Sequence, residues 1–181
     1  MSIISMLSKD IGWSWPLFLF KSYVKKQFLF KKTSWANKRD DETIFVKRLT
    51  LASILYLELK KKFGEEKAFE IIREIIIPVG CNEQWKHLNS LNLKDKTPME
   101  KLMMFNDLMD KKGAPRFNKR EYIEKSKDTC HFIIKRCIFH DFFTEVGTPE
   151  LTKIFCEVDK EFFPKAFPEF KFHRKVHGRI L

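Results

Sequence analysis

The residues best suited to chemistry lie near the C-terminal end of the sequence. Cys137 comes directly before an apolar segment with helical spacing, Ile138–Val146, and His140 follows it by three residues. A thiol at a helix N-terminus faces the positive end of the helix dipole, and the adjacent Lys135 and Arg136 add charge that stabilises a thiolate. Cys137 is therefore a candidate nucleophile, and His140 is its candidate base or orienting group. The alternative interpretation is a core cysteine beside a surface histidine.

A second pair of polar residues, Cys156 and Asp159, is spaced to share one face of the next predicted helix. The carboxylate could accept a proton, bind a substrate nitrogen or ligate a metal. Together with Cys137 and His140, these side chains are also of the types that hold Zn or Fe. Structural zinc motifs repeat Cys or His more strictly, so we expect neither a metal nor another cofactor. A packed cysteine with a solvated carboxylate, and a Cys/His/Asp metalloprotein, are the alternatives.

The elements that must position these residues form the pattern strand–helix–helix–strand over residues 129–181. Residues 129–136 are rich in β-branched and aromatic types and predict a strand. Ile138–Val146 predicts a short helix, and Thr148-Pro149 predicts the N-cap of a second helix that runs to about Phe163. Residues 170–176 alternate and predict a second strand. We expect the two strands to pair as a small antiparallel sheet.

The preceding residues 40–128 are predicted to be helical. One helix begins at Asp40-Asp41-Glu42 and ends at Gly64, and the next runs from Glu65 to Ile77, before Pro78. Thr97-Pro98 predicts the N-cap of a third helix that ends near Met109. The whole chain, 1–181, is therefore predicted to be a single α+β domain, mostly helical, with a small antiparallel sheet in its C-terminal third.

Composition excludes several classes of protein. Hydrophobic residues make up 44% and charged residues 33% of the chain, which is typical of a globular domain. None of the six glycines stands in a Gly-x-Gly spacing, which argues against a nucleotide-binding loop of that type. The sequence shows no secretory signal, so its four cysteines are predicted to be reduced thiols of a cytoplasmic protein.

The net charge of +11 is concentrated in the first third of the chain, where residues 1–62 hold 13 basic and 5 acidic residues. This distribution argues against a nucleic-acid groove across the whole molecule. Residues 1–38 are predicted to be a basic aromatic arm, in which residues 13–32 mix aromatic side chains with lysines. The favoured interpretation is that this arm packs on the domain or on a second subunit, which leaves a homo-oligomer open. The same pattern also occurs in helices that contact a membrane surface.

The C-terminal motifs resemble those of the L-2-amino-thiazoline-4-carboxylic acid hydrolase-like family over roughly residues 129–178. The shared features are a cysteine before a short helix, a Gly-x-Pro-Glu-Leu turn at residues 147–151, a Cys-x-x-Asp and a downstream arginine. The resemblance implies hydrolysis of a C–N bond in a small cyclic amidine or thiazoline substrate. It also implies that Cys137 is the nucleophile or a substrate-binding thiol, with Cys156 and Asp159 as its partners on the facing helix. Arg174, with His173 beside it, would bind a substrate carboxylate.

A non-catalytic small-ligand-binding or interaction protein of the same fold is the main alternative. Ten of the 19 phenylalanines lie within residues 129–181, and a pocket lined by aromatic rings binds apolar ligands without reacting with them. After Arg174 the sequence also departs from the family pattern, because His177 stands near a Thr position and a later Cys-Asp-Phe is missing.

Overall fold

The computed structural model describes residues 10–173. It has the predicted α+β class, mostly helical with a small antiparallel sheet in the C-terminal part. In chain order the elements are η1 (Gly12–Ser14), α2 (Trp15–Lys31), α3 (Asp41–Phe63), α4 (Glu65–Asn89), α5 (Pro98–Lys112), η2 (Ala114–Phe117), β1 (Lys119–Lys125), β2 (Cys130–Arg136), α6 (Ile138–Glu145) and α7 (Leu151–Ala166).

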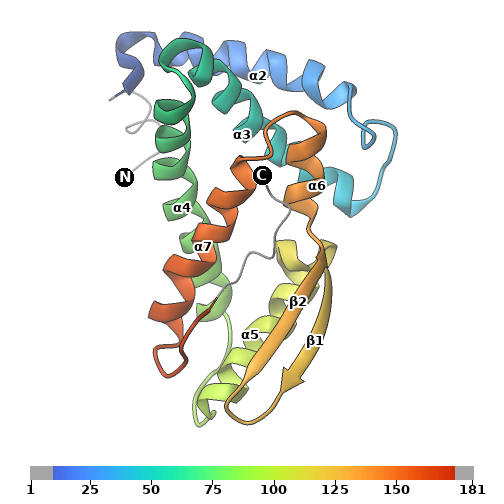
Figure 1. Cartoon of the computed structure of the whole chain (residues 1–181), viewed down its shortest axis with the longest axis vertical. Coiled ribbons are helices and arrows are strands. Elements are labelled where there is room, and N and C mark those ends of the chain that lie inside the picture. Colours follow the sequence, from blue (N-terminus) through green and yellow to red (C-terminus); the bar gives the residue numbers. More distant parts are fainter. Residues whose placement is uncertain (1–9, 174–181) are drawn as a thin grey trace.

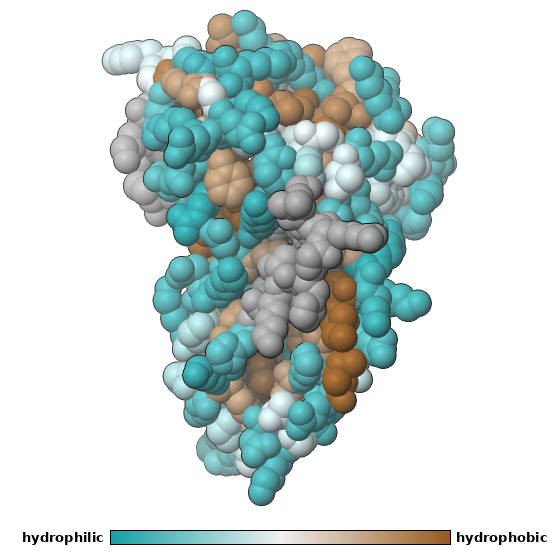
Figure 2. Space-filling model, in the orientation of Figure 1, coloured by the Kyte–Doolittle hydropathy of each residue, from teal (hydrophilic) through white to brown (hydrophobic). Residues whose placement is uncertain are grey.

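The long helices α4 and α7 lie side by side along the long axis of the molecule (Figure 1). Helices α2, α3 and α6 gather at one end of this pair, and α5 and the two strands lie at the other end. Hydrophilic side chains cover much of the face shown in Figure 2, and apolar side chains emerge along the upper edge, where α2 lies. In the part of the chain that the structure describes, no helix has the length and apolar character needed to cross a membrane.

The helix starts predicted near Asp40, Glu65 and Thr97 are confirmed. The Asp40 carboxylate accepts a hydrogen bond from the Thr43 N–H at 2.8 Å and caps α3. Gly64, at φ +83°, ends α3 and begins α4, in a conformation that favours glycine. Thr97 and Glu100 form a reciprocal capping box at the start of α5. Each of these capping signals depends only on neighbouring residues, so the helix starts can be predicted from the sequence.

Helix α4 does not stop before Pro78, as the sequence predicts, but continues to Asn89. Proline in a helix interior costs roughly 3 kcal/mol. Packing on both sides of the proline opposes this cost, because Ile71, Ile72 and Ile75 are buried in one part of the core and Leu88 in another. Beyond the proline, Gly80 lies close to the Val158 side chain of α7, so α4 also packs on α7 there.

The predicted Thr148 N-cap is also wrong. Gly147 adopts φ +74°, and the Thr148 N–H donates to the Phe143 carbonyl at 2.7 Å, so these residues close the end of α6. The buried Thr148 hydroxyl donates to the Ser53 hydroxyl at 3.1 Å and attaches the turn to α3. Helix α7 therefore begins at Leu151, and it continues through Pro164.

The sheet has one predicted strand and one unexpected strand. β2 forms where the sequence predicts it, but its antiparallel partner is β1, within the region expected to be helical. Ser126 donates its N–H to the Thr129 carbonyl at 2.9 Å and closes the short turn between them. A short hairpin connection is the simplest way to pair two strands. The expected partner does not form over residues 170–173, where Phe172 instead stacks on Phe163 at 5.1 Å, and 174–176 lie outside the described residues.

The buried side chains form two clusters that we name the upper and lower core after their places in Figure 1. The upper core joins α3, α4, α6 and α7, and the lower core joins α4, α5 and α7. The upper core includes Leu59, Ile71, Phe142, Phe143 and Ile154, and the lower core is Leu88, Leu102, Phe105, Met109, Phe162 and Phe167. Helices α4 and α7 thus contribute to both clusters.

Candidate active site

Cys137 occupies the position that the sequence predicts, at the N-cap of α6 directly after β2. Its carbonyl accepts the first helical hydrogen bond, from the Asp141 N–H at 3.0 Å. The next N–H, that of Ile138, donates to the side-chain oxygen of Asn118 at 2.9 Å. Asn118 directly precedes β1, so the residues before the hairpin hold the turn in which the half-buried Cys137 lies.

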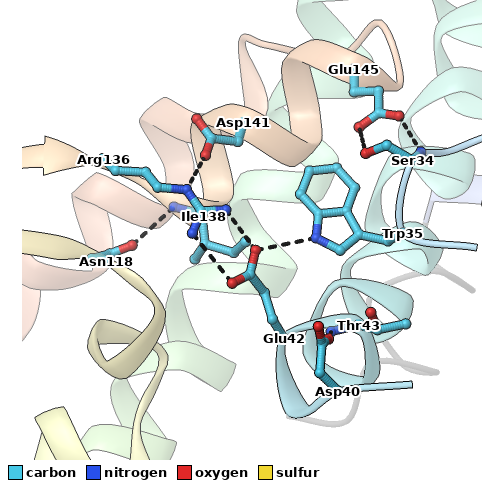
Figure 3. A network of polar contacts seen from close by, with 10 residues as sticks. All are labelled: Ser34, Trp35, Asp40, Glu42, Thr43, Asn118, Arg136, Ile138, Asp141 and Glu145. Atoms are coloured by element: carbon cyan, nitrogen blue, oxygen red, sulfur yellow. Dashed lines mark hydrogen bonds and ion pairs between the residues drawn. The ribbon is translucent and has the colours of Figure 1, made fainter. Parts of the chain in front are cut away.

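Arg136, the residue before Cys137, is held by two carboxylates from different helices (Figure 3). Its guanidinium donates to Glu42 through Nη2 at 2.6 Å and to Asp141 through Nε at 2.8 Å. The Trp35 indole N–H donates to the same Glu42 carboxylate at 3.2 Å. The network ties the end of β2 to α3 and to the first turn of α6, and so fixes the backbone on the strand side of Cys137.

The same network compensates the positive charge that the sequence places beside Cys137. Lys135 pairs with Glu121 across the hairpin at 3.2 Å, and Arg136 pairs with both Glu42 and Asp141. The hydrogen bond from Arg136 is the largest effect on Glu42, and it lowers the pKa of this carboxyl against the opposing effect of burial. Both cations that flank Cys137 are therefore paired with carboxylates, and Cys137 itself lies at the N-terminus of α6.

His140 lies one turn after Cys137 on α6 and is half-buried. Its Nδ1 is buried and has no hydrogen-bond partner among the described residues, and the Cys137 side chain makes no capping hydrogen bond. A buried polar atom without a partner costs about 1 to 3 kcal/mol. Such an atom is a candidate for a bond to a ligand, and catalytic hydrogen bonds often tighten only when substrate is bound.

The second predicted pair, Cys156 and Asp159, lies on α7 against α4. The Asp159 carboxylate accepts a hydrogen bond from the Gln84 amide at 3.0 Å, and the Gln84 carbonyl oxygen is buried without a partner among the described residues. Gln84 is a polar residue that the sequence analysis missed. It reaches Asp159 only because α4 continues beyond Pro78, and no local motif signals that contact.

An aromatic stack connects the two predicted pairs. Phe139 of α6 stacks on Phe155 of α7 with ring centroids 4.6 Å apart, and these rings directly precede His140 and Cys156. The structure thus brings α6 and α7 together at the residues next to two of the candidates. Asp159 lies one turn further along α7, where it faces Gln84 of α4.

The remaining cysteines have the properties of structural thiols. The Cys81 thiol lies 3.8 Å from the Val158 carbonyl oxygen, and burial raises its pKa. Burial likewise raises the pKa of Cys130, near the Asn106 amide. Within residues 10–173, no group of three or more His, Cys, Asp or Glu side chains is arranged to hold a metal ion.

The predicted substrate-binding pair falls at the edge of the structure. His173 is exposed in the coil that follows α7, and Arg174 lies outside the described residues. The structure shows instead a shallow hollow of about 210 Å³ near the start of α6, which the sequence did not indicate. It is lined by Asp110, Pro115, Arg116, Asn118, Arg120 and Tyr122. Asn118 belongs both to this hollow and to the turn that holds Cys137.

Two arginines of this hollow already have acidic partners. Arg120 pairs with Asp110, and its guanidinium lies 4.9 Å from the centre of the Phe132 ring. Arg116 lies 3.5 Å from Asp41 at the start of α3. The hollow therefore presents polar and cationic side chains on the Asn118 side of the α6 N-terminus, and its charges are held in place by neighbouring elements.

The fold and the site define a helix-rich α+β domain in which a cysteine at a helix N-terminus is braced by a hairpin and by α3. The family model for L-2-amino-thiazoline-4-carboxylic acid hydrolase matches residues 44–177, well over half of the chain, and the chain belongs to this family. The sequence motifs resemble the family only over roughly residues 129–178. The family match covers more of the chain, because it also includes α4, α5 and nearly all of α3. No curated protein and no solved structure matches the chain.

Proposed function

We propose that this chain hydrolyses a C–N bond of a small cyclic amidine or thiazoline substrate, with Cys137 as the nucleophile. The observation that supports this most is the place of Cys137 within the family match, at the N-cap of α6. A helix N-terminus stabilises a thiolate and also the negative charge that develops on a substrate during attack. The residues around it are held by Asn118 and by the Arg136 network, which supports a preorganised site.

The proposed reaction has two steps. The Cys137 thiolate adds to the amidine carbon, and the ring C–N bond then breaks as the leaving nitrogen takes up a proton. His140 supplies that proton from the same helix, and Asp159 and Cys156 on α7 bind the substrate nitrogens. Water then gives a proton to His140 and attacks the enzyme-bound carbon, the bond to the Cys137 sulfur breaks, and Cys137 leaves as a thiolate. Arg174, with His173, binds the substrate carboxylate.

The direct test is turnover of 2-amino-thiazoline-4-carboxylate by the purified full chain, followed as loss of the ring by liquid chromatography. We expect Cys137→Ala to lower kcat by more than about 10³-fold, because the nucleophile is removed. Cys81→Ser is the matched control, since Cys81 is half-buried like Cys137 but lies away from α6. We expect it to leave kcat within about twofold of the parent value, a change smaller than 1 kcal/mol in barrier.

Two results would contradict the proposal. One is turnover that persists in Cys137→Ala. The other is a parent chain that binds this substrate and related cyclic amidines in native mass spectrometry without converting them. The second result would favour the non-catalytic ligand-binding alternative.

A further inference from the structure

Helix α2 presents an apolar stripe to solvent. Leu17, Phe20, Val24 and Phe28 are spaced by three, four and four residues, so they lie on one face of the helix. We call these four residues the outer stripe. Their exposed fractions are 56%, 67%, 42% and 63%, which is high for large apolar side chains that follow one another along a helix. A contiguous exposed apolar surface of this kind marks an interaction site.

The outward direction of this stripe is set by the other side of α2, which packs against the domain. Ser22 and Phe30 are buried, and Phe18 and Leu19 pack against the upper core. Lys25 forms an ion pair with Glu58 of α3 at 2.5 Å. The helix is thus apolar on two sides, although one apolar side is enough to attach it to α3.

The outer stripe is bordered by uncompensated positive charge. Helix α2 carries four lysines and no acidic residue. Lys21 lies four residues after Leu17, and Lys31 and Lys32 lie three and four residues after Phe28. These three lysines are exposed, and they form no ion pair within the described part of the chain. The pKa of Lys26 is lowered by burial and by the nearby Lys47, which shows how closely positive charges are placed around this helix.

The charge decides which partner fits this surface. A second copy docked through the same stripe would bring the lysines of one helix against those of the other, at a distance where like charges repel. An anionic lipid surface removes this conflict, because lysines bind the headgroup phosphates while leucine and phenylalanine side chains enter the boundary with the acyl chains. Helix α2 also precedes the residues 44–177 that match the family, so its surface is separate from the shared region.

We propose that the outer stripe of α2 and its flanking lysines dock the protein on an anionic membrane surface. The helix lies flat on that surface, because its inner side stays packed on α3. Trp13, in the short helical turn before α2, is fully exposed and lies next to this surface along the chain. Tryptophan is favoured at the headgroup level of a bilayer, so it adds an interfacial anchor.

The test is co-sedimentation of the full chain with phosphatidylcholine vesicles, with and without 30% phosphatidylserine. We expect binding to the anionic vesicles to be at least tenfold tighter than to neutral vesicles. The double substitution Phe20→Ser/Phe28→Ser should weaken that binding about tenfold or more, since two large apolar side chains are lost. Ile44→Ser is the matched control, because Ile44 is 54% exposed on α3 and lies outside the stripe. It should bind as the parent chain does.

Far-UV circular dichroism and the melting temperature establish that the double variant is folded, since both substituted side chains are exposed. Equal binding of the parent and the double variant would overturn the proposal, as would equal binding to neutral and anionic vesicles. Sedimentation velocity without lipid tests the alternative partner, which is a second copy of the chain. A parent dimer that the double substitution converts to a monomer, with no vesicle binding, would assign the stripe to a second copy and overturn the membrane proposal.

Discussion

Arg136, the last residue of β2, holds the backbone directly before Cys137 in the candidate active site. Its guanidinium bridges Glu42 of α3 and Asp141 of α6, so it positions the turn at Cys137 rather than contacting a substrate itself. We expect Glu42→Gln to reduce the free energy of unfolding at pH 7 by about 1 to 2 kcal/mol, because a partly buried, charge-assisted network is lost. Urea denaturation measures this change. Glu74→Gln, at an exposed position of α4, is a control that should change little.

The contribution of Glu42 should depend on pH in a defined direction. Because its pKa is lowered in the folded protein, chiefly by the hydrogen bond from Arg136, the carboxylate stabilises the fold above the pKa of the unfolded chain, about 4.3. That stability is lost as the pH falls through the lower folded value. The difference in unfolding free energy between the parent and Glu42→Gln should therefore shrink between pH 5 and pH 3. A difference that stays constant down to pH 3 would show that Glu42 does not act through its charge.

The thiols differ in their environments, and alkylation can measure this difference. Burial raises the pKa of Cys81 and of Cys130, so both hold less thiolate near pH 7.5 than a free thiol does. Cys137 lies at a helix N-terminus, and we expect iodoacetamide to label it at least about tenfold faster than either of them. Peptide mass spectrometry of a labelling time course gives the three rates. Labelling of Cys81 or Cys130 at the same rate as Cys137 would contradict this expectation.

At the scale of elements, α4 and α7 fit closely together at Gly80 and Val158. A Cβ atom added at Gly80 would come within 2.8 Å of the Val158 side chain, which is buried and stiff at its first dihedral angle. The overpacking cost of about 1 to 3 kcal/mol exceeds alanine's helix-propensity gain of about 1 kcal/mol. We therefore expect Gly80→Ala to destabilise the protein by roughly 1 kcal/mol in chemical denaturation.

A double-mutant cycle tests the cause of this loss. Val158→Ala removes the methyl groups that the new Cβ atom meets, so the double variant should lose less stability than the two single variants together. Strict additivity would mean that Gly80 is required for a reason other than its contact with Val158.

The elements that the sequence predicted correctly are those with local signals. The caps at Asp40 and Thr97 and the strand before Cys137 depend on neighbouring residues, so pattern and propensity were sufficient. The failures involve packing or pairing between two elements, which no single segment of the sequence signals. Packing against α7 stabilises α4 as a continuous helix through Pro78, and residues 119–125 form a strand because they pair with β2. For the same reason Cys137 was placed correctly at a helix start, whereas Asn118 and Gln84 were missed.

At the scale of the whole molecule, the question is whether the upper and lower cores behave as one unit, as the prediction of a single domain requires. Helix α4 contributes Ile71 to the upper core and Leu88 to the lower core, and α7 contributes Ile154 and Phe162 in the same way. Two continuous helices that cross both cores make separate unfolding costly, because either core can open only if both helices break. We therefore predict a single cooperative unfolding transition.

Tryptophan fluorescence can test this prediction, because Trp35 is buried in the upper core and Trp85 packs against the lower core. Trp35 packs on Phe142 in the upper core, and Trp85 packs on Phe162 in the lower core. In a variant with Trp13, Trp15 and Trp85 replaced by Phe, the Trp35 signal reports on the upper core alone.

Adding Phe162→Ala to this background should cost about 3 to 5 kcal/mol, because a fully buried ring is removed from the lower core. If the two cores unfold together, the Trp35 midpoint in urea shifts by the same amount as the midpoint from far-UV circular dichroism. A Trp35 midpoint that does not move while circular dichroism loses part of its signal early would show that the cores unfold independently. The continuity of α4 and α7 would then not be sufficient to make the chain one cooperative domain.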